Sequence, residues 1–308
     1  MVAKYREMTN SMTASIVIPT FNGRYKIERL LTSLSVQSFT DYEIIVVIDG
    51  STDDTFSFIK SNPWKIEFLK IINQENKGRS IVRNRGARDA KGDVLIFIDD
   101  DMEIAQDCIQ AHMSLLGEKP DIISVGRQLD SESSKKTDFQ NFKAFLSTRW
   151  EENLLTQSNP LTQKSIFLTA ANFALKKETF KKVSGFNEEL TDAEDFDLAM
   201  RAYQQNISLY FNHGAIAFHH DPVTCQQYAM RLQQYKTAHL RLISIHGDAL
   251  NDFNVPKYKP YKGLKRLIYR FFSLPIWIRT IDGFNWLRIL PQKWRYKIYE
   301  IIITAQTI

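Results

Sequence analysis

Short runs of consecutive apolar residues alternate with stretches of helical periodicity along the first two thirds of the chain. The runs are typical of strands that are buried on both faces, and they lie at 14–19, 43–48, 66–72, 94–98 and 122–126. Apolar residues recur every three or four positions between them, which predicts helices over 24–36, 79–90 and 106–116 and a shorter helix capped by residues 52–54. Strands that alternate with helices indicate βαβ units and a mostly parallel sheet.

The pattern becomes weaker after the last of these strands. Residues 130–164 are more polar and less periodic, which predicts a variable insertion that contacts a second substrate. Further strands are expected at 166–175, 208–211 and 215–219, and further helices at 177–183, 193–205 and 224–245. We therefore divide the chain into a tail at 1–13, an α/β domain at 14–222 and a helical region at 223–308.

The charge of the chain is distributed unevenly. The net charge is +5, yet residues 256–308 carry eleven Lys or Arg against two acidic residues, together with eleven aromatic residues. In this tail, basic residues alternate with apolar ones in helical spacing, which predicts a helix lying on an anionic membrane surface through 257–299. The alternative is an amphipathic helix that packs on the α/β domain or on the second subunit of a homodimer. No nucleic-acid-binding motif is present.

The cysteines and the N-terminus favour a cytoplasmic location, at the inner face of the cell membrane if the tail binds lipid. The two cysteines, Cys108 and Cys225, have no metal-ligand spacing and are expected to be reduced. Residues 1–13 are polar and lack the apolar core of a secretory signal. No run of 18 apolar residues is present, so a spanning helix is not expected.

Three aspartates, Asp99, Asp100 and Asp101, directly follow the apolar run at 94–98. Ligands in parallel α/β sheets bind beyond the carboxyl ends of the strands. Crowded carboxylates repel one another and stay ionised only beside a cation or hydrogen-bond donors. Oxygen-rich clusters bind Mg²⁺ or Mn²⁺, and Mg²⁺ is often shared with substrate phosphates, so these residues predict a metal-bridged diphosphate site.

Charged residues also end other predicted elements. Asp49 follows the strand at 43–48, where its carboxylate can accept from a base edge or a ribose hydroxyl. The alternative is a local role in an Asx-turn or as a helix N-cap. Arg79 and Arg83 are i, i+4 neighbours, so both can face the ligand edge of the sheet. A guanidinium there suits phosphate or the planar edge of a base.

Two later clusters are candidates for proton transfer and for metal binding. Four carboxylates crowd the start of the helix at 193–205, and capping needs only one of them. Glu194 or Asp195 is therefore a candidate general base for a substrate hydroxyl. His219 and His220 lie at the end of a predicted strand and are either structural residues or metal ligands. As ligands they would favour Mn²⁺, because imidazole suits Mn²⁺ better than Mg²⁺.

Several motifs follow one another with regular spacing. They are SIVIPTFN at 15–22, VIDGSTDDT at 47–55, NKG at 76–78 with RNRG at 83–86, FIDDD at 97–101, and Asn172 followed by GFNE at 185–188 and EDFDL at 194–198 with Arg201. In this order they resemble the inverting family 2 glycosyltransferases of the GT-A fold, over about residues 14 to 220.

The resemblance implies a Rossmann-like α/β fold in which helices flank a mostly parallel sheet, with a helical C-terminal extension. It implies an enzyme that uses Mn²⁺ or Mg²⁺ to move a sugar from a nucleotide-sugar, usually a UDP-sugar. The acceptor would be a hydroxyl of a glycan or lipid-linked molecule in polysaccharide or cell-envelope biosynthesis. The donor contacts carried over are Thr20, Asn22, Asp49, Arg83 and Asp99, and the metal ligands are Asp101, Asp99 and either His219 or His220. Asp195 would be the base, with Glu194 as the alternative.

One residue departs from the pattern, and two other functions compete with it. Family members often have a neutral residue at the position of Asp100, which either shares the donor or metal site or is merely tolerated. A sugar nucleotidyltransferase would need a Gly-rich loop after the first strand, where residues 19–22 read Pro-Thr-Phe-Asn. A non-catalytic protein that keeps the fold and binds a membrane surface is the other alternative, and the intact acidic motifs argue against it.

Overall fold

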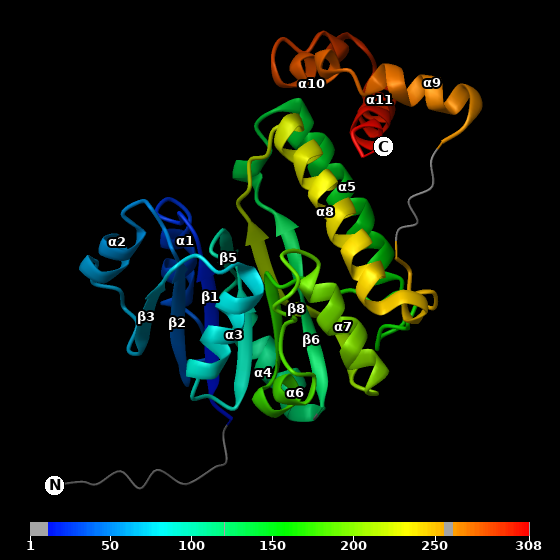
Figure 1. The fold of residues 1–308 in the computed structure, drawn as a ribbon. Coiled ribbons are helices and arrows are strands. Elements are labelled where there is room, and N and C mark those ends of the chain that lie inside the picture. The colour runs from blue at the N-terminus through cyan, green and yellow to red at the C-terminus, as the bar shows by residue number, and fades with distance from the viewer. Residues whose placement is uncertain (1–11, 120, 256–260, 308) are drawn as a thin grey trace, which may run out of the picture.

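The computed structural model describes residues 12–119, 121–255 and 261–307, and its centre is a single eight-stranded sheet (Figure 1). The strand order is β3-β2-β1-β4-β7-β6-β8-β5. Strand β7 is antiparallel to both of its neighbours and β5 is antiparallel to β8, while the other neighbouring pairs are parallel. The expected α/β fold with a mostly parallel sheet is confirmed. Most of the predicted N-terminal tail and residues 257–260 of the predicted lipid-binding segment lie outside the described residues.

The strands are β1 (Ala14–Thr20), β2 (Tyr42–Asp49), β3 (Leu69–Gln74), β4 (Val94–Ile98), β5 (Met102–Ile104), β6 (Ile122–Asp130), β7 (Asn172–Lys176) and β8 (Ser208–His219). The α-helices are α1 (Ile27–Leu34), α2 (Thr55–Ser61), α3 (Arg79–Asp89), α4 (Cys108–Glu118), α5 (Asp138–Leu155), α6 (Lys177–Lys182), α7 (Glu194–Gln204), α8 (Cys225–His246), α9 (Gly263–Phe272), α10 (Pro275–Asp282) and α11 (Gln292–Ala305). Short 3₁₀ helices are η1 (Glu132–Ser134), η2 (Gly247–Leu250) and η3 (Trp286–Ile289).

The apolar strands are buried on both faces, as their uninterrupted apolar runs predict. Side chains alternate across β4, so that Leu95 and Phe97 enter one core while Ile96 and Ile98 enter the other. The first core packs under α3, α6 and α7, and the second packs under α1 and α4. The sheet is thus the middle of three layers, which leaves the strand ends open for ligands.

Residues 130–164 are more regular than their weak periodicity predicts, because an 18-residue helix, α5, occupies most of the segment. The side chain of Thr137 accepts from the backbone N–H of Gln140, and the side chain of Gln140 accepts from the backbone N–H of Thr137. This capping box is a start signal that the sequence contained. The two strands expected at 208–219 are one continuous strand, β8, and β5 was not predicted.

Helices α5 and α8 lie side by side as a stalk that carries α9, α10 and α11 at its far end (Figure 1). A third core joins them, in which Phe139 and Phe142 of α5 contact Tyr299 of α11. Asp138 accepts two hydrogen bonds from Arg295, at 2.7 and 2.8 Å, and a third from the Tyr299 hydroxyl. The expected helical C-terminal region is therefore a small folded unit fixed to the stalk.

Candidate active site

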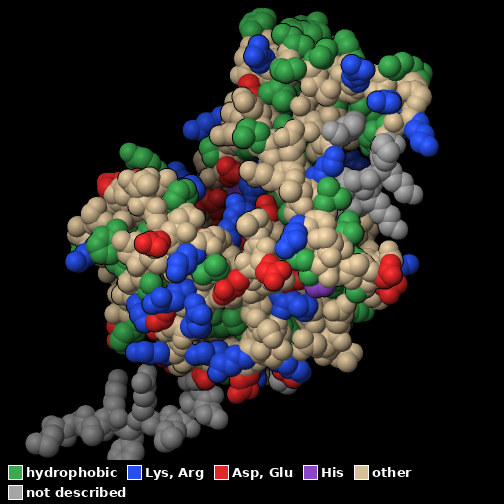
Figure 2. All heavy atoms as spheres, in the orientation of Figure 1, with side chains coloured by type: hydrophobic (Ala, Val, Ile, Leu, Met, Phe, Trp, Pro, Cys, Tyr) green, Lys and Arg blue, Asp and Glu red, His purple; other side chains and the backbone are tan. Residues whose placement is uncertain are grey.

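A cleft of about 670 Å³ opens where β1, β2 and β4 end (Figure 2). The parallel register places the last residues of these strands along one edge, so that Thr20, Asp49 and Asp99 face the same space. The rings of Phe21 and Tyr25 lie at its mouth and are 48% and 85% exposed. The volume falls within the range of pockets that hold small molecules and cofactors.

Asp49 is buried in the wall of this cleft and organises the loop that leads into α3. Its carboxylate accepts from the backbone N–H of Lys77 at 2.8 Å and of Gly78 at 2.9 Å, and also from Gln74. Gly78 has a φ of 91°, a conformation that favours glycine and turns both N–H groups toward the carboxylate. The alternative of a local Asx-turn is thus wrong, because the partners of Asp49 come from the loop after β3.

Asp100 is directed toward the end of β1. Its carboxylate accepts from the Thr20 hydroxyl at 2.6 Å and lies 3.8 Å from the Lys26 ammonium group. Burial raises the pKa of Asp100 to about 7, although the charge of Lys26 acts in the opposite direction. These contacts explain how an acidic residue is accommodated at the position that departs from the family pattern.

Asn22 is turned out of the cleft. Its side-chain oxygen accepts from the backbone N–H of Thr52 at 2.8 Å, and its backbone N–H donates to the Ser51 hydroxyl. Asn22 therefore joins the loops after β1 and β2, and the structure does not bring it together with the other predicted donor contacts.

Arg83 links the two halves of the site. Its guanidinium donates to Asp99 at 2.6 Å and to Glu194 at 2.7 Å, and its side chain is only 4% exposed. Burial acts to lower the pKa of Arg83, but the charges of Asp99 and Glu194 outweigh it and raise that pKa. Glu194 is thus committed to an ion pair that joins α7 to α3.

Asp101 lines the cleft and pairs with His219, which lies on the side of the adjoining hollow. The Asp101 carboxylate is 3.2 Å from Nε2 of His219, and this pairing holds the pKa of Asp101 at about 2 and raises that of His219, although burial disfavours both charged forms. His220 is engaged elsewhere, because its ring nitrogens contact Glu103 at 2.7 Å and Ser133 at 3.0 Å. The structure therefore brings His219, and not the side chain of His220, to the predicted metal position.

Asp101 and His219 offer one oxygen and one nitrogen donor of the kind that a divalent cation accepts. Neighbouring ligands on one octahedral Mg²⁺ lie about 3 Å apart, which matches the separation of the Asp101 oxygen and the His219 nitrogen. In the part of the chain that the structure describes, no three His, Cys, Asp or Glu side chains form a metal-binding group. Asp101 and His219 are thus a partial ligand set of the type that a substrate diphosphate completes.

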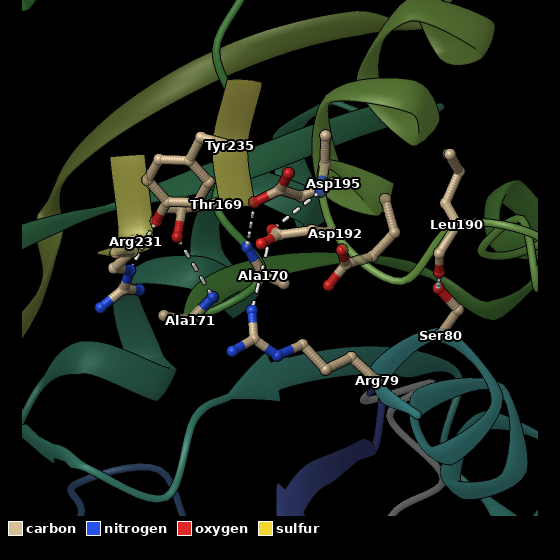
Figure 3. A network of polar contacts seen from close by, with 12 residues as sticks. Arg79, Ser80, Thr169, Ala170, Ala171, Leu190, Asp192, Asp195, Arg231 and Tyr235 are labelled. Atoms are coloured by element: carbon tan, nitrogen blue, oxygen red, sulfur yellow. Dashed lines mark hydrogen bonds and ion pairs between the residues drawn. The ribbon is translucent and has the colours of Figure 1, made fainter. Parts of the chain in front are cut away.

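Asp195 lies in a second hollow, of about 610 Å³, that adjoins the first. Arg83, Asp99 and Asp101 line both hollows, so the two meet at the metal position. The Asp195 carboxylate accepts from the backbone N–H of Ala170 at 3.3 Å (Figure 3), and also from the backbone N–H of Phe196. Burial and the neighbouring charge of Glu194 raise the pKa of Asp195 to about 7. Such a carboxylate can take a proton from a hydroxyl near neutral pH.

The second hollow has walls that no sequence motif marks, although Trp150 lies in the segment 130–164 that is predicted to contact a second substrate. Arg231 and Tyr235 reach it from α8 and hydrogen-bond to each other at 2.8 Å (Figure 3). Trp150 of α5 and Phe167 stack edge to face beside it, with ring centroids 4.4 Å apart. Their spacing along the chain carries no signal, because α5 and α8 meet only in the folded protein.

The profile described as "Glycosyl transferase family 2" matches residues 15–184, more than half of the chain. The chain belongs to this family. An uncharacterized glycosyltransferase from Haemophilus influenzae is 26% identical over 191 residues, which is 62% of this chain and 62% of that protein. A chondroitin synthase from Pasteurella multocida is 25% identical over 252 residues, or 70% of this chain and 26% of that protein. The family 2 chain therefore spans less than two thirds of these relatives.

Solved structures of other proteins share the fold. The mannosyltransferase PcManGT from Pyrobaculum calidifontis, in complex with GDP-Man and Mn²⁺, has a TM-score of 0.61 at 16% identity, covering 96% of this chain and 86% of that one. S. aureus TarS 1-349 has a TM-score of 0.56 at 18% identity, covering 96% of this chain and 89% of that one. The GT-A-type fold expected from the motifs is confirmed by these similarities.

Proposed function

We propose that this family 2 protein transfers a sugar from a nucleoside diphosphate sugar to a hydroxyl of a glycan acceptor, with inversion at the anomeric carbon. One observation carries the proposal. The cleft at the ends of β1, β2 and β4 meets the hollow of Asp195 at Asp99 and Asp101. A donor in the first and an acceptor in the second would place the reacting atoms at this junction.

The donor cleft suits a nucleoside diphosphate. Asp49 and Asp99 lie along it as acceptors for base and ribose groups, and Phe21 and Tyr25 offer ring faces at its mouth. Arg79 and Arg231 line the same cleft and supply positive charge for the phosphates. We propose a UDP-sugar as the donor, and the structure of TarS in complex with UDP-GlcNAc supports this choice of nucleotide.

The chemistry is one in-line displacement. The acceptor oxygen bonds to the anomeric carbon while the bond from that carbon to the diphosphate oxygen breaks. Asp195 takes the proton of the acceptor hydroxyl, and Glu194 and Arg83 hold α7 so that Asp195 faces the junction. A divalent cation held by Asp101 and His219 would offset charge on the leaving diphosphate.

The acceptor hollow suits a sugar chain. Trp150, Phe167, Tyr228 and Tyr235 line it, and their rings can pack against the apolar faces of pyranose rings. Gln128 and Lys143 add hydrogen-bond donors for hydroxyl groups. A glycan is therefore the acceptor class that we propose.

Donor binding and transfer can be tested separately. UDP-sugars and GDP-sugars with Mn²⁺ are screened for an increase in Tm of the purified protein, because a ligand that binds the folded state stabilises it. Asp195→Asn should keep the donor-induced increase but lose about 10²-fold or more of the transfer rate. Asp192→Asn is the control, since Asp192 is a carboxylate of the same hollow that lies just before α7 and pairs with Arg79 at 3.7 Å; it should lose much less.

Two results would contradict the proposal. If no nucleotide-sugar raises Tm in the presence of Mn²⁺ or Mg²⁺, the cleft is not a donor site. If Asp195→Asn transfers as fast as Asp192→Asn, Asp195 is not the base.

A further inference from the structure

Helix α9 carries an apolar stripe that faces solvent. Its members, Leu264, Leu267, Ile268 and Phe271, have the i, i+3, i+4, i+7 spacing of one helix face. They are 42–72% exposed, and none of the ten residues of α9 is buried. A stripe of this kind normally packs against a core, so its exposure requires an explanation.

Exposed apolar residues also occur in the elements that follow α9. The large ones are Leu274, Ile276, Phe284, Trp286, Ile289 and Trp294. Figure 2 shows apolar side chains gathered over the end of the stalk, with basic side chains among and beside them. We call these ten residues, from Leu264 to Trp294, the outer apolar face.

The outer apolar face is not the result of helices that lack a core. Ile281 of α10 and Leu287 of η3 are buried against Tyr299 and the other members of the third core. The ion pair between Arg295 and Asp138 fixes α11 to the stalk. Elements α10, η3 and α11 therefore have an inner side that packs in the third core and a second apolar side that is exposed.

Charge identifies what can cover this face. Lys265, Arg266 and Arg270 project from α9 and are exposed. Residues 261–299 contain a single acidic residue, Asp282. Its carboxylate accepts from the backbone N–H groups of Cys225 and Gln226 at the start of α8. The partner that covers this face must therefore have an apolar interior and a negatively charged boundary.

We propose that the outer apolar face lies on an anionic lipid surface, with its aromatic and aliphatic side chains among the upper acyl chains and its basic residues at the headgroups. A second copy of the chain fits less well, because a two-fold interface would bring the same basic residues together. Among the described residues, no helix is both long enough and apolar enough to cross a bilayer. The attachment is therefore to one surface of the membrane.

The test uses the purified full chain and sedimentation with vesicles, without donor or acceptor. Vesicles of phosphatidylcholine containing phosphatidylglycerol should bind the protein, and vesicles of phosphatidylcholine alone should bind it much more weakly. Added salt should weaken binding to the anionic vesicles, because it screens the basic residues. Failure of the wild-type chain to bind anionic vesicles overturns the proposal, whatever the protein does with a nucleotide-sugar.

Matched variants distinguish vesicle binding through the outer apolar face from nonspecific binding through other exposed residues. Replacing Leu264, Leu267 and Phe271 together with Gln should weaken binding by about tenfold or more, while Val36→Gln with Phe68→Gln, at positions 59% and 60% exposed on the α/β domain, should not. Arg266→Gln with Arg270→Gln should weaken it by about tenfold, and Lys60→Gln with Lys65→Gln should not.

All variants should retain the wild-type urea midpoint, since the replaced residues are exposed. Equal binding by the face variants and their controls overturns the proposal. Concentration-dependent self-association of the wild type, lost in the Leu264, Leu267 and Phe271 variant and accompanied by no vesicle binding, would instead assign the face to a second copy.

Discussion

Replacing Arg83 with methionine removes the guanidinium that lies between two carboxylates from different elements. Glu194, on α7, has a side chain only 4% exposed, so water cannot take the place of the lost cation. Breaking a buried ion pair from one side costs about 3–5 kcal/mol of the free energy of unfolding. Asp99 is 32% exposed and regains water, so its share is about 1 kcal/mol or less. We expect a total loss of about 4 kcal/mol.

The measurement is urea unfolding followed by far-UV circular dichroism at neutral pH. Arg85→Met is the matched control, because Arg85 lies on the same helix in an ion pair with Asp89 and is 44% exposed. That change should cost about 0.5 kcal/mol or less. Adding Glu194→Gln to Arg83→Met removes the stranded charge, so the double variant should cost about 1–3 kcal/mol less than the two single changes summed.

Two outcomes would refute this reasoning. Strict additivity of the Arg83 and Glu194 changes would mean that their pairing contributes nothing beyond the separate groups. A loss for Arg83→Met as small as that for Arg85→Met would mean that solvent reaches Glu194 in the folded protein.

Three further predictions follow from the site and its packing. Because Asp195 must be ionised to accept a proton and its pKa is raised to about 7, kcat/KM should be level above pH 7 and fall about tenfold per pH unit below it; a profile flat through neutrality would exclude Asp195 as the base. His219→Ala should weaken donor-dependent Mn²⁺ binding in calorimetry, while His220→Ala should retain it, and equal effects of the two changes would contradict the assignment of the metal position. Gly86→Ala should lower the free energy of unfolding by about 1–3 kcal/mol, measured in urea, because a Cβ there would overlap with Val17 of β1; an unchanged midpoint would show that α3 can move away from the sheet without cost.

A strand of the sheet could be predicted where its own residues determine its position and its ends. The run Val94–Ile98 is apolar at every position and ends at Asp99, and β4 has these same bounds. Helix α5 was missed because its apolar residues face two cores. Phe139 and Phe142 enter the third core, while Leu154 enters the first core, on one face of the sheet. The apolar residues of α5 therefore do not recur along a single helix face.

The positions of the charged residues at the strand and helix ends were determined by the sequence alone. An apolar strand that ends in carboxylates presents them at the ligand edge of a parallel sheet, which is a local consequence of the chain. The family motifs are likewise a property of the sequence, and the match of residues 15–184 to family 2 covers those that lie before residue 185.

The tertiary structure decided which of these groups are committed and which remain available. Glu194 and Asp195 are neighbours in sequence, yet Glu194 is held by Arg83, 111 residues away, while Asp195 faces the second hollow. His219 and His220 are likewise separated by their partners, Asp101 and Glu103. The chemistry available to a titratable side chain depends on the charges and donors around it, and here those groups come from distant parts of the chain that only folding brings together.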